Sequence, residues 1–270
     1  MKSILSKALL VLACLTLPLE AYEIKTGSDK FANISYPATS CDINLEEGTI
    51  ETWVRIDFDP AFNKLTPNTI FYMPMTYFNV GIYGKSLLLN LISRCSYDTR
   101  TQETKQSLYL NGDMIGSTIA VPNEQLNWEK GQWHYLAVTW KNLGKKIKYQ
   151  LYVDGVVMSE NEAEPKKAVF LPEGSNIEIG SHYFNCSYGA IDSFRVSSVV
   201  RTREEIQAAF GTKTLNWDRF TMLLDKFENI DVVNRKTTTE DFKTGHIKGA
   251  FEVLEDQAFC GIKLHVIDEE

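Results

Sequence analysis

Glycosidic bonds are cleaved by two carboxylates, so a pair of acidic side chains at suitable spacing would indicate a glycoside hydrolase. These must lie about 5–5.5 Å apart for retention of configuration or about 6.5–9.5 Å apart for inversion. A strand that carries such a pair reads E-x-D-x-x-E or E-x-D-x-E, and neither pattern occurs in the chain. The nearest spacing is Asp57-x-Asp59, which Pro60 places at a strand end. We interpret it as a polar strand terminus, with metal binding as the alternative.

The histidines form no catalytic motif. They are His134, His182, His246 and His265. None belongs to an H-x-H or H-E-x-x-H pattern, so a zinc hydrolase has no support. The chain also has no G-x-S-x-G nucleophile elbow and no P-loop. We therefore expect a protein that is not an enzyme, in which His134 has a structural role within its strand.

The N-terminal residues have the pattern of a secretory signal peptide. A basic start is followed by an apolar run over residues 8–19 and by the small residue Ala21, which favours cleavage after Ala21. The alternative is a weak lipobox over residues 11–14, in which Cys14 would carry a lipid anchor. The run is shorter than the ~20 residues of a transmembrane helix, and no later segment is long and apolar enough. We expect an exported protein that is secreted, periplasmic or at the cell surface. If Cys14 carries a lipid anchor, the protein is a lipoprotein.

Four cysteines remain once the leader is removed: Cys41, Cys95, Cys186 and Cys260. In an exported protein this number indicates two disulfides, for which three pairings are possible, and buried free thiols are the alternative. The formal net charge of −7 argues against nucleic acid as a partner. Phosphate binding needs a basic surface that releases counterions.

Most of the elements that must position these side chains are short segments in which apolar and polar residues alternate. In the segment 48–56, Ile50 and Val54 fall on one face of a strand, and Glu51, Trp53 and Arg55 on the other. Turns such as Asn111-Gly112 and Asp154-Gly155 supply the positive φ of tight hairpins. We expect further strands at 30–36, 69–73, 78–82, 86–92, 107–110, 134–140, 149–153, 177–179, 190–196 and 220–225. Such spacing predicts an all-β protein with two packed antiparallel sheets.

One short helix and a C-terminal extension complete the prediction. Thr202 and Glu205 form a capping box, after which Gly211 is expected to end a helix of one or two turns on the edge of the sandwich. Residues 231–248 are polar without periodicity, whereas 251–254 and 259–267 could add one or two strands. The predicted divisions are a signal peptide at 1–21, a sandwich at 22–229 and an extension at 230–270.

Five motifs follow one another along the predicted sandwich. They are GTIETWV at 48–54, WHYLAVTW at 133–140, LYVDG at 151–155, IG at 179–180, and AIDSFRV with TREEI between 190 and 206. Their order resembles the laminin G-like jelly rolls of the concanavalin A-like lectin/glucanase superfamily. The resemblance implies a jelly-roll sandwich with a concave sheet that binds glycans or protein surfaces. It also implies a calcium ion in many members, for which Asp29 and Asp192 occupy positions that are acidic in related domains.

The chain departs from the family's order of motifs in one place. Family members often begin near a stretch similar to residues 221–227, which here lies at the end of the sandwich. That stretch could close a sheet or begin an incomplete second unit.

A glycan site needs aromatic rings beside planar polar groups, because pyranose faces stack on rings while hydroxyl groups form hydrogen bonds. We expect it on the face that carries Trp53, if that face is the open concave one; the alternative is that Trp53 belongs to the core. The leading hypothesis is an exported, non-catalytic, glycan-binding protein, and the alternative is an adhesion or structural module that binds a surface protein. The candidate ligand-binding residues are Glu51, Trp53, Arg55, Arg195, Tyr183 and Tyr188.

Overall fold

The computed structural model describes most of the chain after residue 32. The described residues are 33–41, 43–56, 66–79, 82–98, 103–111, 119–126, 128–129, 131–164, 176–180, 189–248, 250–255 and 260–265. The predicted signal peptide, Cys14, Asp29, Asp57, Asp59, Tyr183, Cys186 and Tyr188 lie outside them. No helix in the described part is long and apolar enough to cross a membrane.

The described elements are mostly strands. Those of the first half are β1 (Asn33–Pro37), η1 (Ala38–Cys41), β2 (Glu47–Ile56), β3 (Thr66–Asn79), β4 (Ile82–Asp98), β5 (Glu103–Asn111), β6 (Ile119–Val121), α1 (Asn123–Leu126) and β7 (Trp133–Asn142). They are followed by β8 (Ile147–Val153), β9 (Val156–Ala163), β10 (Asn176–Gly180), β11 (Gly189–Ser197) and α2 (Arg203–Thr212). The C-terminal strands are β12 (Thr221–Asp225), β13 (Ile230–Asp231), β14 (Lys236–Thr238), β15 (Thr244–Lys248), β16 (Ala250–Glu255) and β17 (Cys260–His265).

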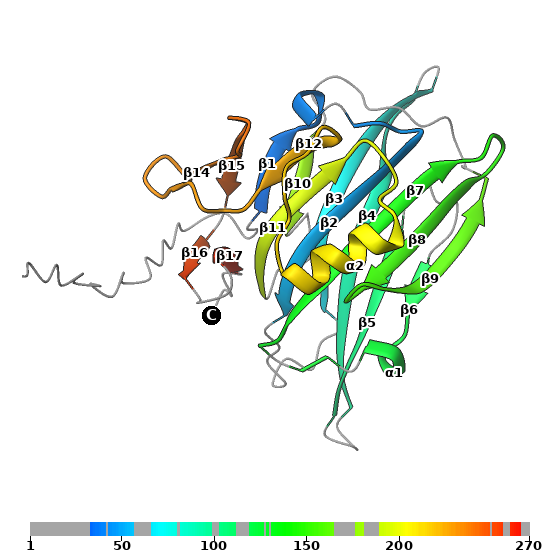
Figure 1. Cartoon of the computed structure of the whole chain (residues 1–270), viewed down its shortest axis with the longest axis horizontal. Helices are drawn as coiled ribbons and strands as arrows, with labels where there is room; N and C mark the ends of the chain where they lie inside the picture. Colours follow the sequence, from blue (N-terminus) through cyan, green and yellow to red (C-terminus); the bar gives the residue numbers. More distant parts are fainter. Residues whose placement is uncertain are drawn as a thin grey trace, which may run out of the picture.

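Two antiparallel sheets face each other (Figure 1). Among the described residues, one sheet has nine strands in the order β13-β14-β15-β1-β10-β3-β4-β5-β6. The other has eight in the order β16-β17-β11-β2-β7-β8-β9, and β12 also pairs with β11. The predicted all-β, two-sheet jelly-roll sandwich is confirmed.

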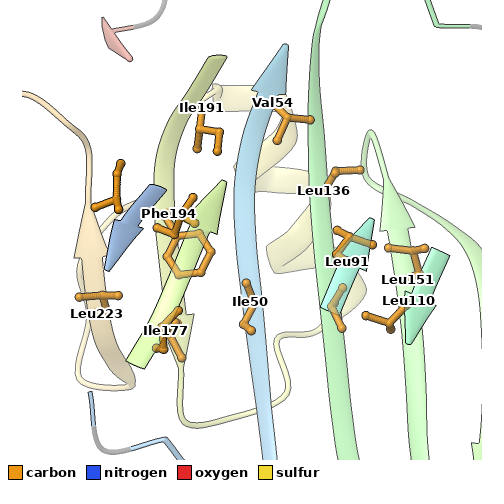
Figure 2. Packing of buried hydrophobic residues seen from close by; sticks show 14 of the residues in the cluster. Ile50, Val54, Leu91, Leu110, Leu136, Leu151, Ile177, Ile191, Phe194 and Leu223 are labelled. Carbon is orange, nitrogen blue, oxygen red and sulfur yellow. The ribbon is translucent and has the colours of Figure 1, made fainter. Parts of the chain in front are cut away.

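The core lies between the two sheets and is built by the alternation seen in the sequence. Ile50 and Val54 of β2 point into it beside residues of β7 and β11 (Figure 2). The opposite sheet contributes Leu91, Leu110 and Ile177. Burial of each such side chain contributes about 1.5–3 kcal/mol, so this interface supplies most of the stabilising free energy.

Helix α2 covers the other face of the eight-stranded sheet. Thr202 caps its N-terminus, and the capping box with Glu205 is present as predicted. The helix continues past Gly211 to Thr212, because Lys213 takes the left-handed conformation at the C-terminal cap with φ 56°. It crosses the sheet over β2 and β7 and does not lie at an edge (Figure 1). The prediction of an edge position is therefore wrong.

Two strand predictions need correction in the nine-stranded sheet. Segments 69–73 and 78–82 were expected to be separate strands, but β3 runs without interruption from Thr66 to Asn79. Its pairing with β4 shifts register between Thr69 and Phe71 and between Met73 and Pro74. Such bulges let Pro74 remain within a paired strand.

The C-terminal residues extend both sheets. The polar segment 230–248, for which no strands were expected, contains β13, β14 and β15, which continue the nine-stranded sheet beyond β1. The two later segments form β16 and β17 beside β11, as predicted. β13 has two residues and β14 has three, which is too short to show a period of two, and β15 buries only Gly245 and Ile247.

Candidate functional site

The predicted ligand face around Glu51 lies in the interior. Arg195 donates from Nε to Glu51 Oε2 at 2.7 Å and from Nη2 to Glu51 Oε1 at 2.7 Å. Tyr135 donates its hydroxyl to the same carboxylate at 2.5 Å. Burial, with the neighbouring carboxylate, raises the pKa of Tyr135 well above its ordinary value, so the phenol stays a donor. Glu51 and Arg195 are therefore a buried ion pair that joins β2 to β11, and their prediction as an open ligand surface is wrong.

Trp53 is buried beneath α2. Its ring stacks on Phe210 of the helix at a centroid distance of 5.9 Å and contacts Tyr135 at 5.4 Å. The alternative given above, that Trp53 belongs to a core, is the one the structure supports. Arg55 is half-buried at the end of β2, with its guanidinium 5.5 Å from the ring centroid of Trp133 on β7. Helix α2 therefore covers the face of β2 on which the glycan site was expected.

Asp192 is buried on β11 at a bulge. Ser193 is the inserted residue, with φ 49°, and it donates its hydroxyl to the Asp192 carboxylate at 3.1 Å. Burial, against the lowering effect of the hydrogen bonds from Ser193 and with a contribution from the negative charges of Glu228 and Asp225, raises the pKa of Asp192 to about 7. Calcium needs six to eight oxygen ligands. The described residues contain no group of three or more acidic, histidine or cysteine side chains suited to a metal, so calcium at Asp192 stays a prediction.

The predicted disulfide cysteines occupy different elements. Cys41 is buried at the end of η1, and its sulfur lies 3.5 Å from the carbonyl oxygen of Pro37. Cys95 lies on β4 opposite Thr66, and Cys260 begins β17. The pairing stays a prediction.

His134 has the structural role expected of it. Its ring stacks on Trp128 at a centroid distance of 4.2 Å, and Nδ1 lies 2.9 Å from Asp154 Oδ2. Asp154 also accepts from the amide of Tyr135 and starts the β8–β9 turn with φ 50°, followed by Gly155 with φ 77°. The predicted hairpin turn is confirmed, and His134 anchors it to β7.

Two exposed aromatic rings lie elsewhere, on the segment after α2 and on the turn between β14 and β15, which a contact between Lys243 and Trp217 brings together. Trp217 is 39% exposed and Phe242 is 87% exposed. The ammonium of Lys243 lies 5.7 Å from the centroid of the Trp217 ring and binds the Asp241 carboxylate. We call these four residues, Trp217, Asp241, Phe242 and Lys243, the Trp217 surface. It combines rings and planar polar groups, as a sugar site requires.

A hydrogen-bonded turn holds the Phe242 side of this surface. Thr239 accepts from the amides of Phe242 and Lys243, through its carbonyl and its hydroxyl respectively, at 3.0 and 2.8 Å. Its hydroxyl also donates to Asp241 at 2.5 Å, and Lys243 donates from Nζ to the carbonyl oxygen of Met222 on β12. Phe242 itself has φ 64°, which is costly for a bulky residue and needs such surrounding bonds. The turn therefore holds the backbone of Phe242 in place and leaves its ring exposed.

A second network fixes the Trp217 side. Leu215 is buried under the helix, and the carbonyl oxygen of Asn216 accepts from Arg195 at 2.8 Å. Asp218 receives two hydrogen bonds from the buried Arg201, one of them at 2.7 Å. These bonds hold the pKa of Asp218 well below its ordinary range, so the pair stays charged. Trp217 thus lies between two anchored residues and loses little conformational freedom when a ligand binds.

None of the four residues was among the candidates from the sequence. One signal was available: Phe242 is the single aromatic residue in the polar segment 231–248. An isolated aromatic ring without apolar neighbours at strand or helix spacing has no core to join. Trp217 gave no comparable signal. Leu215, which is buried, lies two residues before it, so Trp217 has an apolar neighbour at strand spacing and could have belonged to the same core.

Comparison with known proteins agrees with this architecture. Residues 119–207 match the family model described as the Concanavalin A-like lectin/glucanases superfamily. Residues 119–207 share the concanavalin A-like fold. The resemblance found in the sequence is thereby confirmed. A search of curated proteins finds no sequence that matches.

Three similar solved structures extend the comparison to most of the sandwich. A candidate carbohydrate-binding protein from Bacteroides ovatus has a TM-score of 0.53 and 17% identity, over 85% of this chain and 60% of that one. The CBM40 of a Ruminococcus gnavus IT-sialidase, bound to α2,3-sialyllactose, has a TM-score of 0.39 and 14% identity, over 71% and 97% of the two chains. A Trypanosoma rangeli sialidase with sialic acid has a TM-score of 0.43 and 16% identity, over 63% and 23%. At 17% identity the Bacteroides ovatus structure shows a shared fold, and this chain spans about 60% of its length.

Proposed function

We propose that this protein binds glycans through the Trp217 surface and does not cleave them. The observation that carries the proposal is the exposure of two rings, Trp217 and Phe242, on hydrogen-bonded loops that the contact of Lys243 with Trp217 joins. The concanavalin A-like fold supports it, as does the Bacteroides ovatus structure described as a candidate carbohydrate-binding protein. An exposed phenylalanine with a left-handed backbone costs stability, which favours a role in recognition.

The physical basis is stacking with little loss of entropy. A pyranose face that covers Trp217 or Phe242 removes apolar surface from water, while the hydroxyl groups at its rim can bond Asp241 and the backbone carbonyls of the turn. Because hydrogen bonds hold the backbone at both loops, binding would cost less conformational entropy than on loops that must first be ordered. Loss of one ring should weaken binding at least about tenfold, which corresponds to about 1.4 kcal/mol.

A glycan array tests the proposal, followed by titration of the strongest glycan. Trp217→Ala and Phe242→Ser should each weaken binding at least about tenfold. The matched control is Val233→Ser, since Val233 is 89% exposed on the neighbouring β13–β14 turn and outside the Trp217 surface. A blank array, or equal loss in the control, would contradict the proposal. A blank array would favour the adhesion module as the function of this fold.

The absence of turnover is tested with the same glycan. Incubation with the protein should release no reducing ends above the blank, because the chain has neither strand pattern of paired acids. Release that disappears in Asp57→Asn or Asp59→Asn would overturn this part of the proposal and make the chain a hydrolase.

Export is the third part of the proposal and rests on the N-terminal sequence. Mass spectrometry of the processed chain distinguishes its two forms. A mature protein that begins at Tyr22 indicates a secretory signal peptide, whereas a lipid-modified N-terminal Cys14 indicates an anchored lipoprotein. An unprocessed chain that begins at Met1 would contradict export.

A further inference from the structure

We infer that the Trp217 surface selects neutral sugar rings over glycans that carry carboxylates or sulfates. This inference rests on the proposed function and names the class of ligand. It follows from how the charges at the surface are already compensated.

Lys243 is a cation in contact with the exposed Trp217 ring. Its ammonium binds the Asp241 carboxylate and the carbonyl oxygen of Met222 and lies over the face of Trp217. An ammonium has three N–H donors. Asp241 and Met222 engage two of them, and the Trp217 ring compensates part of the positive charge. A ligand carboxylate would have to compete with Asp241 for this cation, at close range to a like charge. Lys243 therefore orders the surface and offers little attraction to an anion.

Two acidic residues next to these four, Asp218 and Glu240, are compensated in the same way. Asp218 binds Arg201 in the segment of Trp217, and Glu240 binds Lys226 at 2.7 Å in the turn of Phe242. The whole chain has a formal net charge of −7, which repels polyanions at long range. Neither the local nor the overall field favours an acidic glycan.

Arg219 is the residue through which an acidic ligand could still bind. It is exposed, and its guanidinium lies 4.5 Å from the ring centroid of Phe220. Such a contact at an exposed site contributes about 0.5–1 kcal/mol, so it does not prevent the guanidinium from binding a carboxylate. Arg219→Gln is therefore the variant that separates the two ligand classes.

Salt dependence gives a second readout. Stacking of a neutral ring removes apolar surface and creates no ion pair, so its dissociation constant should change less than about twofold between roughly 50 and 500 mM NaCl. An acidic glycan held by Arg219 should lose about tenfold or more over the same range, as the Debye length falls well below about 10 Å.

The experiment uses the full mature chain with pairs of homopolymers that differ only in oxidation of the C6 carbon, a hexan and its uronan of the same linkage. The expected result is binding to a neutral member, insensitive to salt, unchanged in Arg219→Gln and lost in Trp217→Ala. Preference for the uronan, with loss in salt and in Arg219→Gln, would overturn this inference and leave glycan binding intact. Binding to neither class on a broad array would overturn the proposed function and the inference together.

Discussion

Replacement of Asp192 by asparagine should stabilise the protein at alkaline pH. The carboxyl is buried on β11, close to the charges of Asp225 and Glu228, and its pKa is raised to about 7. An unfolded aspartate has a pKa near about 3.9. Between these two values the folded state binds a proton that the unfolded state does not, so stability decreases as the pH rises through this window. The asparagine side chain cannot ionise, so the substitution removes this dependence.

The magnitude follows from the two pKa values. Relative to a side chain that cannot ionise, Asp192 lowers the free energy of unfolding by about 4 kcal/mol at pH 8 and by about 1.5 kcal/mol at pH 5. Urea unfolding of the wild type and of Asp192→Asn at both pH values isolates this group, since all other titrating groups are shared. The stability gained by the variant should be larger at pH 8 by about 2.5 kcal/mol. A gain that is equal at the two pH values would refute the reasoning.

Three further predictions concern the buried ion pair, the core between the sheets and helix α2. Glu51→Ala leaves the buried Arg195 without its carboxylate and should lower the free energy of unfolding by about 3–5 kcal/mol in urea titrations; a loss below about 1 kcal/mol would show that the pair is not buried. Gly48→Ala would place a Cβ 2.2 Å from the Trp140 ring and should destabilise by about 1–3 kcal/mol, with an unchanged melting temperature as the contradictory result. Gly211→Ala meets no atom within 4 Å inside a helix and should stabilise by about 0.5–1 kcal/mol, so a lower melting temperature would be inconsistent with helix at this position.

The sandwich could be predicted from the sequence because its core strands alternate. Ile50 and Val54 on one face of β2, and Glu51 and Trp53 on the other, gave two distinct faces, and the structure has both. The sequence could not show which face is open. That depends on α2, which docks on β2 from about 150 residues further along the chain, and no local pattern specifies such a contact.

The candidate site was missed for a related reason. Trp217 and Phe242 belong to separate loops, and Lys243 joins them only through a tertiary contact with the Trp217 ring. The charged residues chosen from the sequence, Glu51 and Arg195, satisfy each other inside the protein. A buried ion pair and a ligand-binding pair have the same residue types, so the difference between them is exposure, which is a property of the folded state.

The indole signals of the five tryptophans offer the most direct test of the central claim, which is that glycans bind at the Trp217 surface. In a two-dimensional ¹H–¹⁵N spectrum each indole N–H gives its own peak, assigned with Trp→Phe variants. Addition of the strongest neutral glycan should move the Trp217 peak and leave those of the buried Trp53 and Trp140 in place. A shift at Trp133 with Trp217 unmoved would place the ligand elsewhere on the sheet, and the account of this surface would be wrong.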